Sequence, residues 1–254
     1  EVAERTKDIA ALNRNGALDP DSNYAFGEGG AGTFSDGKLF TRSKKRGDYN
    51  KALQTLVFHG ASPEILYEAH PHIGTDKLPA IMTAIRRTIT GSGGKVIFNA
   101  RVTDLLIRGG KIKGVLCGAE RIEGIAVVLA TGHSASDIYQ MLHSGGVLVE
   151  AKPFAMGVRI EHPQQLIDGI QYHGAGREYL PAASYTLTAQ VGGRGVYSFC
   201  MCPGGFIVPA LTDPAESVVN GMSPSQRNSR WANSGIVTEI RLGDFEHLRD
   251  EFGE

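Results

Sequence analysis

The sequence predicts an α/β protein, α+β overall, and three patterns along its 254 residues support this fold class. Residues 49–59 and 77–90 carry apolar side chains at steps of three and four, the spacing of helices that bury one face. Residues 125–130 form an unbroken apolar run, which is typical of a strand buried on both faces of a parallel sheet. Beyond residue 145, short extended segments alternate with Gly, Pro, Asn and Ser, which favours a mostly antiparallel sheet.

The helix boundaries follow from the residues that flank the periodic segments. A first helix is expected over residues 1–15, where Gly16 provides the C-cap. For the helix over residues 77–90, Asp76 is the expected N-cap, and Pro79 is tolerated in the first turn. A further helix is expected over residues 134–143, directly after the apolar run.

The predicted strands fall into two groups along the chain. A strand and a small meander are expected over residues 95–98, 101–108 and 111–117, with Gly109-Gly110 as a two-residue hairpin turn. The extended segments of the second half are residues 154–161, 184–191, 195–200, 205–209 and 236–241. The change of pattern between Ser144 and Pro153 predicts a domain boundary, which divides the chain into residues 1–148 and 149–254.

Composition excludes several classes of protein. With 41% hydrophobic and 21% charged residues, the chain is not disordered, and a net charge of -1 gives no general attraction to nucleic acid or anionic membranes. The basic cluster at residues 42–46 is interpreted as a solvated loop. No apolar run is long enough to span a membrane or act as a signal peptide. Three cysteines do not make a disulfide framework, so a reducing cytoplasm is expected.

Residues 26–39 are the most informative stretch, because five glycines alternate there with small polar residues and a lysine. Glycine adopts positive φ and lets backbone N–H groups approach a ligand closely, and Lys38 could add positive charge. An anionic cofactor is the natural ligand of such a segment. The alternative is a flexible surface turn.

Five stretches in this order resemble the bacterial FAD-dependent dehydrogenases of unassigned substrate, a family of NAD(P)/FAD-dependent oxidoreductases. The stretches are residues 27–39, 72–79, 130–135 with Asp137, 157–163 and 200–205. The resemblance implies a partial FAD-binding Rossmann-like domain with a three-strand meander over residues 1–148, and a partial antiparallel substrate domain over residues 149–254. It implies an oxidoreductase that acts on a small organic substrate through non-covalent FAD, with NAD(P)H as a candidate electron donor. A flavin-holding scaffold or regulatory module without turnover is the alternative.

The resemblance also implies the residues that bind FAD. In the loop that borders the pyrophosphate and flavin these are Gly29, Gly30, Gly32, Thr33, Ser35, Asp36 and Lys38. At the end of the predicted parallel strand they are Ala130, Thr131 and Gly132, and Val102 would contact adenine through its backbone. Each has a simpler interpretation: an Asp36–Lys38 ion pair, a strand-to-helix turn and a buried valine without a ligand.

No catalytic residue and no metal site is assigned. His133 and Asp137 could serve as a flavin-facing acid or base, although a helix-capping role is favoured. Arg159 and Glu161 share one side of a strand and either bind a carboxylate or pair with each other. For Cys200 and Cys202, buried thiols lining a pocket wall are favoured over redox or metal roles.

Two elements of a complete FAD domain are missing from the sequence. Neither a strand followed by G-x-G-x-x-G nor the acidic residue for the ribose is present. The chain is therefore interpreted as an internal fragment of a larger flavoprotein, and the fragment alone is expected to be inactive.

Overall fold

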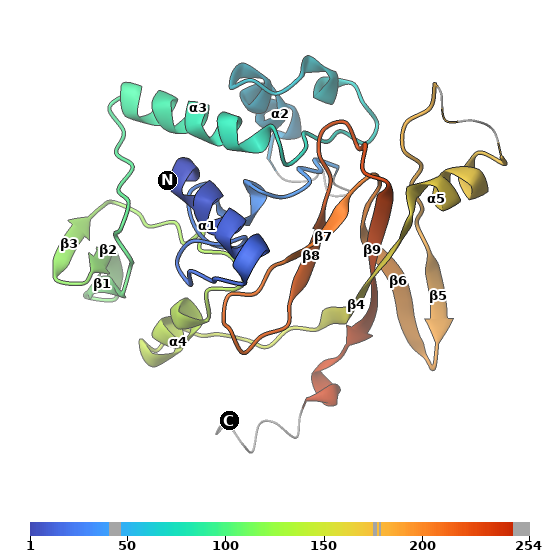
Figure 1. Cartoon of the computed structure of the whole chain (residues 1–254). Helices are drawn as coiled ribbons and strands as arrows, with labels where there is room; N and C mark the ends of the chain where they lie inside the picture. The colour runs from blue at the N-terminus through green and yellow to red at the C-terminus, as the bar shows by residue number, and fades with distance from the viewer. Residues whose placement is uncertain (41–46, 175–176, 178, 246–254) are drawn as a thin grey trace. The chain divides into compact units, whose positions relative to one another are not determined.

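The computed structural model describes residues 1–40, 47–174, 177 and 179–245. These residues form two compact units (Figure 1). One unit comprises residues 86–150 together with Glu1, and the other comprises residues 2–85 together with the chain from Ala151 onward. Helices and antiparallel sheets both occur, so the predicted α/β class, α+β overall, is confirmed.

The larger unit is built on a four-stranded antiparallel sheet of order β4-β9-β6-β5. Its strands are β4 (Phe154–Pro163), β5 (Thr188–Val191), β6 (Arg194–Cys202) and β9 (Trp231–Ile240). β9 pairs with β4 along its whole length and with β6 on its other side. The start of β9 is fully buried at Ala232, Asn233 and Ser234, where it pairs with the ends of β4 and β6, so the buried part of the sheet lies at this end. Helix α5 (Gln164–Gln171), which the sequence analysis missed, follows β4 directly.

A two-stranded sheet packs against the first helix in the same unit. β7 (Phe206–Pro209) pairs with β8 (Val219–Met222), which the sequence analysis also missed. The predicted first helix is α1 (Val2–Asn15), and Gly16 follows it with φ of 68°. Ile9 and Leu12 of α1 form one core with Val208 and Met222 of this sheet. This packing brings the glycine-rich segment, which follows α1, close to the two-stranded sheet of β7 and β8.

The predicted helices over residues 49–59 and 77–90 are confirmed as α2 (Tyr49–Phe58) and α3 (Leu78–Gly91). A short helix η2 (Pro63–Leu66) follows α2. A second core joins Leu53, Ile65 and Ile81 from these three helices. Asp76, the expected N-cap of α3, accepts hydrogen bonds from the backbone N–H (2.6 Å) and hydroxyl (2.8 Å) of Ser225.

The smaller unit contains the predicted meander. β1 (Asp104–Arg108), β2 (Lys111–Cys117) and β3 (Glu120–Glu123) are antiparallel neighbours. Gly109 and Gly110 join β1 to β2 with φ of 58° and 70°, as the two-residue turn requires. Helix α4 (Ser136–Ser144) corresponds to the helix expected over residues 134–143.

Two strand predictions in this unit are wrong. Residues 95–98 and 125–130 adopt no strand, and Ile125 and Val128 are 107% and 87% exposed. A strand buried on both faces needs paired neighbours and covering helices. Within the described part of the chain, the sheet of this unit is only the small meander, so the run has nothing to pair with.

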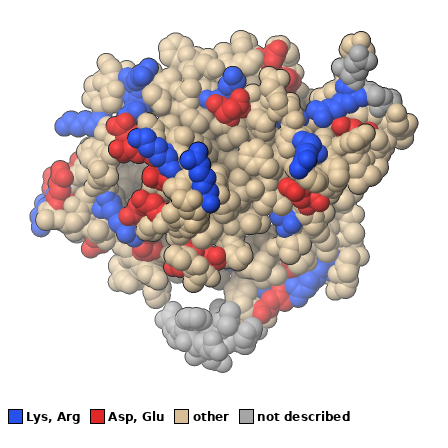
Figure 2. All heavy atoms as spheres, in the orientation of Figure 1, with Lys and Arg blue, Asp and Glu red and all other residues tan. Residues whose placement is uncertain are grey.

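The compact units divide the chain at Glu150/Ala151, but residues 2–85 belong with the second half. The division into a cofactor domain (1–148) and a substrate domain (149–254) therefore stays a prediction. Figure 2 shows acidic and basic side chains interspersed on the visible face, in keeping with the net charge of -1. No helix among the described residues is long and apolar enough to cross a bilayer. The basic cluster at residues 42–46 lies outside the described residues.

Candidate functional site

A buried arginine organises the glycine-rich loop. Arg5 of α1 is 1% exposed, and its guanidinium donates to the backbone carbonyls of Asn23 (2.8 Å), Tyr24 (3.2 Å), Glu28 (2.7 Å) and Gly30 (2.8 Å). Burial lowers the pKa of Arg5 to about 10, and the charge of Glu28 opposes this shift. Because four carbonyl groups are tied to one fixed side chain, the loop is held in one conformation rather than being a free surface turn.

The glycines of this loop fall into two groups. A side chain at Gly27 would collide with the Arg5 side chain, and one at Gly29 would collide with Thr33 and Met82. At Gly30 and Gly32, in the short helix η1 (Gly30–Gly32), a Cβ would meet nothing within 4 Å. Gly30 requires glycine because its φ is 64°, whereas no positive φ is recorded for Gly32. The packing of the chain therefore gives no reason for a glycine at position 32.

The hydroxyls of the loop are used internally. Thr33 is fully buried and donates to the carbonyl of Glu28 (2.8 Å). Ser35 donates to the carbonyl of Gly32 (2.9 Å) and accepts from the backbone N–H of Gly37 (3.1 Å). Open space for a ligand thus lies at Gly30 and Gly32 rather than at Thr33.

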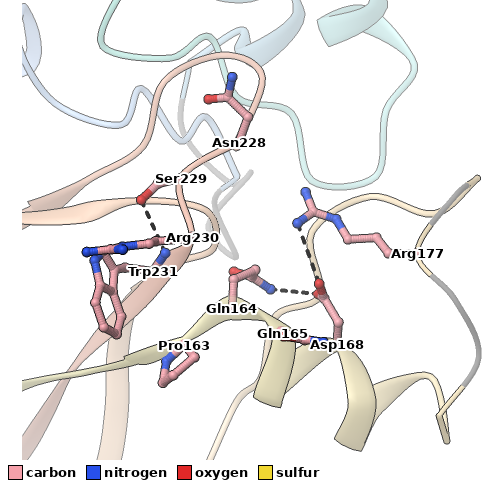
Figure 3. A pocket seen from close by; sticks show the side chains of 9 residues that line it. All are labelled: Pro163, Gln164, Gln165, Asp168, Arg177, Asn228, Ser229, Arg230 and Trp231. Carbon is pink, nitrogen blue, oxygen red and sulfur yellow. Dashed lines mark hydrogen bonds and ion pairs between the residues drawn. The ribbon is translucent and has the colours of Figure 1, made fainter.

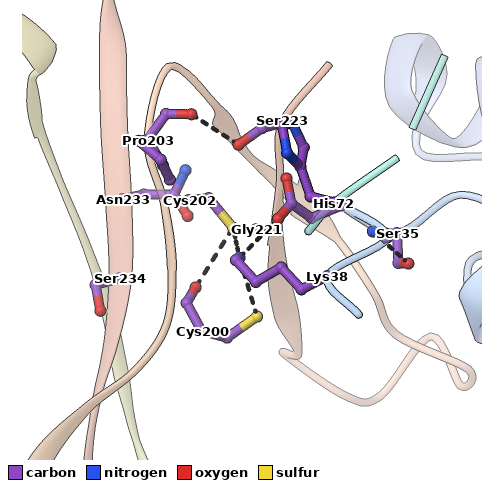
Figure 4. Close-up of polar contacts among 12 residues, drawn as sticks. Ser35, Lys38, His72, Cys200, Cys202, Pro203, Gly221, Ser223, Asn233 and Ser234 are labelled. Carbon is purple, nitrogen blue, oxygen red and sulfur yellow. Dashed lines mark hydrogen bonds and ion pairs between the residues drawn. The ribbon is translucent and has the colours of Figure 1, made fainter. Parts of the chain in front are cut away.

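Lys38 connects the loop to two cysteines of β6 (Figure 4). Its Nζ lies 2.8 Å from Oδ2 of Asp36, 3.3 Å from Sγ of Cys202 and 3.7 Å from Sγ of Cys200. Burial lowers the pKa of Lys38, but Cys202, Asp36 and Cys200 raise it by more, so the net shift is upward. The ion pair of Asp36 and Lys38, expected as the simpler interpretation, exists, and it lies against both thiols.

A bulge in β6 sets the positions of the two sulfurs. Phe199 pairs with Gly235 and Cys202 with Asn233, so β6 carries one extra residue between these pairs. Cys200 lies in this bulge and has a φ of 52°, which is uncommon for a residue with a Cβ. Cys202 is fully buried, whereas Cys200 is partly exposed.

The two thiols have opposite protonation tendencies. The hydrogen bond with Cys202 and the charges of Lys38 and Arg159 hold the pKa of Cys200 well below its usual range, against the effect of burial. The same hydrogen bond and burial raise the pKa of Cys202. Of the two sulfurs, Cys200 is therefore the one whose surroundings favour the thiolate.

Arg159 of β4 supports the bulge. Its Nη1 donates to the carbonyl of Cys200 (3.3 Å) and to Oδ1 of Asn233 (2.6 Å). A side chain at Gly221 would collide with Asn233 and Arg159. Among the described contacts Arg159 does not pair with Glu161 but contacts the thiol segment, and carboxylate binding by Arg159 stays a prediction.

The remaining predicted FAD residues belong to the smaller unit. Val102 is half-buried, and Ala130, Thr131 and Gly132 are exposed and lie outside any strand. Asp137 accepts from Arg101 (3.2 Å from Nε and 2.7 Å from Nη2), which lowers the pKa of Asp137. Their contribution to the cofactor site, and that of His133, stays a prediction.

An open hollow of about 580 Å³ lies elsewhere in the larger unit (Figure 3). Residues from the end of β4, from α5 and from the segment before β9 line it: Pro163, Gln164, Gln165, Asp168, Arg177, Asn228, Ser229, Arg230 and Trp231. The buried Gln164 donates to Asp168 (2.7 Å) and to the carbonyl of Ala183 (3.0 Å), and accepts from the N–H of Gly204 (2.7 Å). The side chains of Gln164 and Asp168 are thus used within the fold rather than being free for a ligand.

The described residues contain no group of three or more His, Cys, Asp or Glu side chains that could hold a metal ion. Around Cys200 and Cys202, Lys38 contacts both sulfurs and Asp36, and Arg159 donates to the carbonyl of Cys200.

Comparisons with known proteins bear on the larger unit. Residues 153–252 match the family described as FAD-dependent protein, C-terminal domain-like. This match supports an FAD-dependent family. The chain is also similar to an "Uncharacterized protein" of Clostridium beijerinckii, with 43% identity over 249 residues, which is 97% of this chain and 46% of that protein. The chain thus spans about half the length of this relative.

Proposed function

We propose that the protein is an FAD-dependent oxidoreductase, which acts on a small organic substrate through non-covalently bound flavin. The family match at residues 153–252 supports the cofactor class. The observation that carries the proposal is the glycine face of the anchored loop: Gly30 and Gly32 open to free space, on a backbone that Arg5 holds in place. A backbone without side chains at these positions suits close approach of a phosphate-bearing ligand.

The loop and the adjacent charges have separate roles in this proposal. Gly29 and Thr33 shape the loop by packing, whereas Gly30 and Gly32 would contact the cofactor. The Asp36–Lys38 pair and Ser35 border the same segment. Val102, Ala130, Thr131 and Gly132 are kept as proposed cofactor-binding residues.

Bound FAD would supply hydride or electron transfer at its isoalloxazine ring. The chain would position the cofactor and exclude competing reactions. NAD(P)H is proposed as the electron donor, and the cytoplasm as the location.

The experiment uses the full-length protein, purified in the dark and examined by visible absorbance. We expect a flavin spectrum, release of FAD on heat denaturation, and bleaching on anaerobic addition of NADH or NADPH. If the protein contains no flavin and takes up none on reconstitution, the cofactor proposal is wrong. If it binds FAD but reacts with no donor or acceptor in a broad screen, it is a flavin-holding module and the enzymatic part of the proposal is wrong.

A further inference from the structure

The two cysteines of β6 differ in the properties that decide how thiols react. Cys200 is partly exposed and Cys202 is completely buried, although they are only two residues apart. One ammonium group, Nζ of Lys38, lies within 3.7 Å of both sulfurs. An accessible thiolate beside a buried thiol is the arrangement in which one sulfur attacks an incoming group and the other resolves the adduct.

The surroundings favour negative charge on the exposed sulfur first. Lys38 and Arg159 are the cations that act on Cys200, and Asp36, paired to Lys38, is the nearby anion. Burial and the hydrogen bond with Cys200 raise the pKa of Cys202, so the buried sulfur is the later of the two to ionise. His72 lies near Asp36, and its Nε2 is 3.2 Å from the carbonyl of Ser225.

Lys38 can serve each sulfur in turn. Its Nζ is closer to Cys202 (3.3 Å) than to Cys200 (3.7 Å). Once Cys200 is part of a disulfide, it carries no charge, and the same ammonium then favours the thiolate of Cys202. Lys38 is thus a positioning residue for both steps.

We propose that Cys200 and Cys202 form a redox-active dithiol that exchanges electrons with small disulfides, with Cys200 as the attacking sulfur, Cys202 as the resolving sulfur and Lys38 as the shared cation. This activity goes beyond the proposed flavin chemistry and does not depend on it, because it can be measured in flavin-free protein.

The exchange balances in two steps. The Cys200 thiolate attacks one sulfur of a disulfide RSSR, a bond forms between Cys200 and that sulfur, and RS⁻ leaves and takes a proton from solvent. Cys202 then gives up its proton, attacks Sγ of Cys200 and expels the second RS⁻, which that proton neutralises. The pair has lost two electrons and one proton, solvent has supplied the second proton, RSSR has become two RSH, and the reverse reaction reduces the pair again.

The test treats the full-length protein with oxidised glutathione, blocks free thiols with N-ethylmaleimide and maps the peptides by mass spectrometry. We expect a disulfide between Cys200 and Cys202. In Cys202→Ser, a glutathione adduct should accumulate on Cys200, whereas in Cys200→Ser the buried Cys202 should stay reduced. Cys117→Ser, a change in the other compact unit, is the matched control and should behave as the unsubstituted protein.

A second pair of variants keeps both cysteines. These variants test the proposal even if the cysteine substitutions prevent the protein from folding. Lys38→Met should shift the pH profile of the first exchange upward by about one pKa unit, which slows the exchange about tenfold only where the pH lies below the pKa of Cys200 in both proteins, and Lys38→Arg should restore most of the rate there. Equal rates in all three proteins would overturn the role of Lys38. Absence of the Cys200–Cys202 disulfide, or glutathione on Cys202 before Cys200, would overturn the proposal itself.

Discussion

The larger unit contains two buried polar clusters that differ in what their groups bind. In the hollow of Figure 3, Gln164 and Asp168 bond to each other and to backbone groups of Ala183 and Gly204. Around Lys38, the ammonium group contacts Asp36 and two sulfurs, and no hydrogen bond satisfies Oδ1 of Asp36 among the described residues. A cluster whose polar groups are satisfied by backbone holds the fold together. A cluster in which a charged group contacts other titratable side chains can instead take part in proton transfer or nucleophilic attack.

The largest effect on the free energy of unfolding should come from a substitution in the cluster of Gln164 and Asp168. Asp168→Ala removes one of the two acceptors of the Gln164 side chain, which keeps the carbonyl of Ala183, and leaves the buried Ala183 N–H without its acceptor. We expect a loss of about 3 kcal/mol in the free energy of unfolding, measured in urea. Glu120→Ala, at an exposed position of β3, is the control and should change stability by under about 0.5 kcal/mol. An unchanged unfolding free energy in Asp168→Ala would remove the structural role of this cluster.

The second effect concerns the protonation of Cys200. Its lowered pKa keeps a thiolate present as the pH falls below the range of ordinary thiols, so iodoacetamide should modify Cys200 in the folded protein at pH 6. Lys38→Met removes a cation and raises this pKa, which should shift the pH profile of the modification rate upward by about one pKa unit. Peptide mapping across a pH series measures both. A pH profile for Cys200 equal to that of the denatured protein would contradict the proposed electrostatics.

The smallest effect should come from an exposed ion pair. Arg101 and Asp137 bond at 2.7 Å, but their side chains are 64% and 44% exposed. Asp137→Asn should therefore cost under about 0.5 kcal/mol. Because the folded pKa of Asp137 is lowered, this small contribution is present at neutral pH and is lost as the pH falls through that pKa. Thermal unfolding at pH 7 and pH 3 checks it, and a loss above 1 kcal/mol at pH 7 would assign Asp137 a larger role.

The sequence correctly predicted helices and a turn that depend on interactions between residues close together in the chain. The helical spacing of residues 49–59 and 77–90 and the Gly109-Gly110 turn appear as expected. The apolar run at residues 125–130 was misassigned, because a buried strand depends on partners that composition does not reveal. Helix α5 was missed because it has only eight residues.

The candidate site could be predicted only in part. The glycine-rich loop was recognisable, but its anchor Arg5 was not, although this arginine occupies one of the apolar positions of α1 beside Val2, Ile9 and Leu12. Lys38 and Cys202 are 164 residues apart in the sequence, so their contact is a tertiary property that no spacing rule could give. The bulge that separates Cys200 from Cys202 likewise depends on the pairing of β6 with β9.

The central claim is that the open glycine face of the anchored loop binds FAD, and one pair of variants tests it directly. In Gly32→Val the added Cβ meets no atom of the described residues within 4 Å and no positive φ is recorded, so folding stability should be nearly unchanged, while the affinity for FAD, measured by flavin fluorescence in the full-length protein, should fall by at least about tenfold. Gly29→Val, which collides with Thr33 and Met82, should instead destabilise the fold. Unchanged FAD affinity in a fully stable Gly32→Val protein would contradict the claim and return the loop to a structural role.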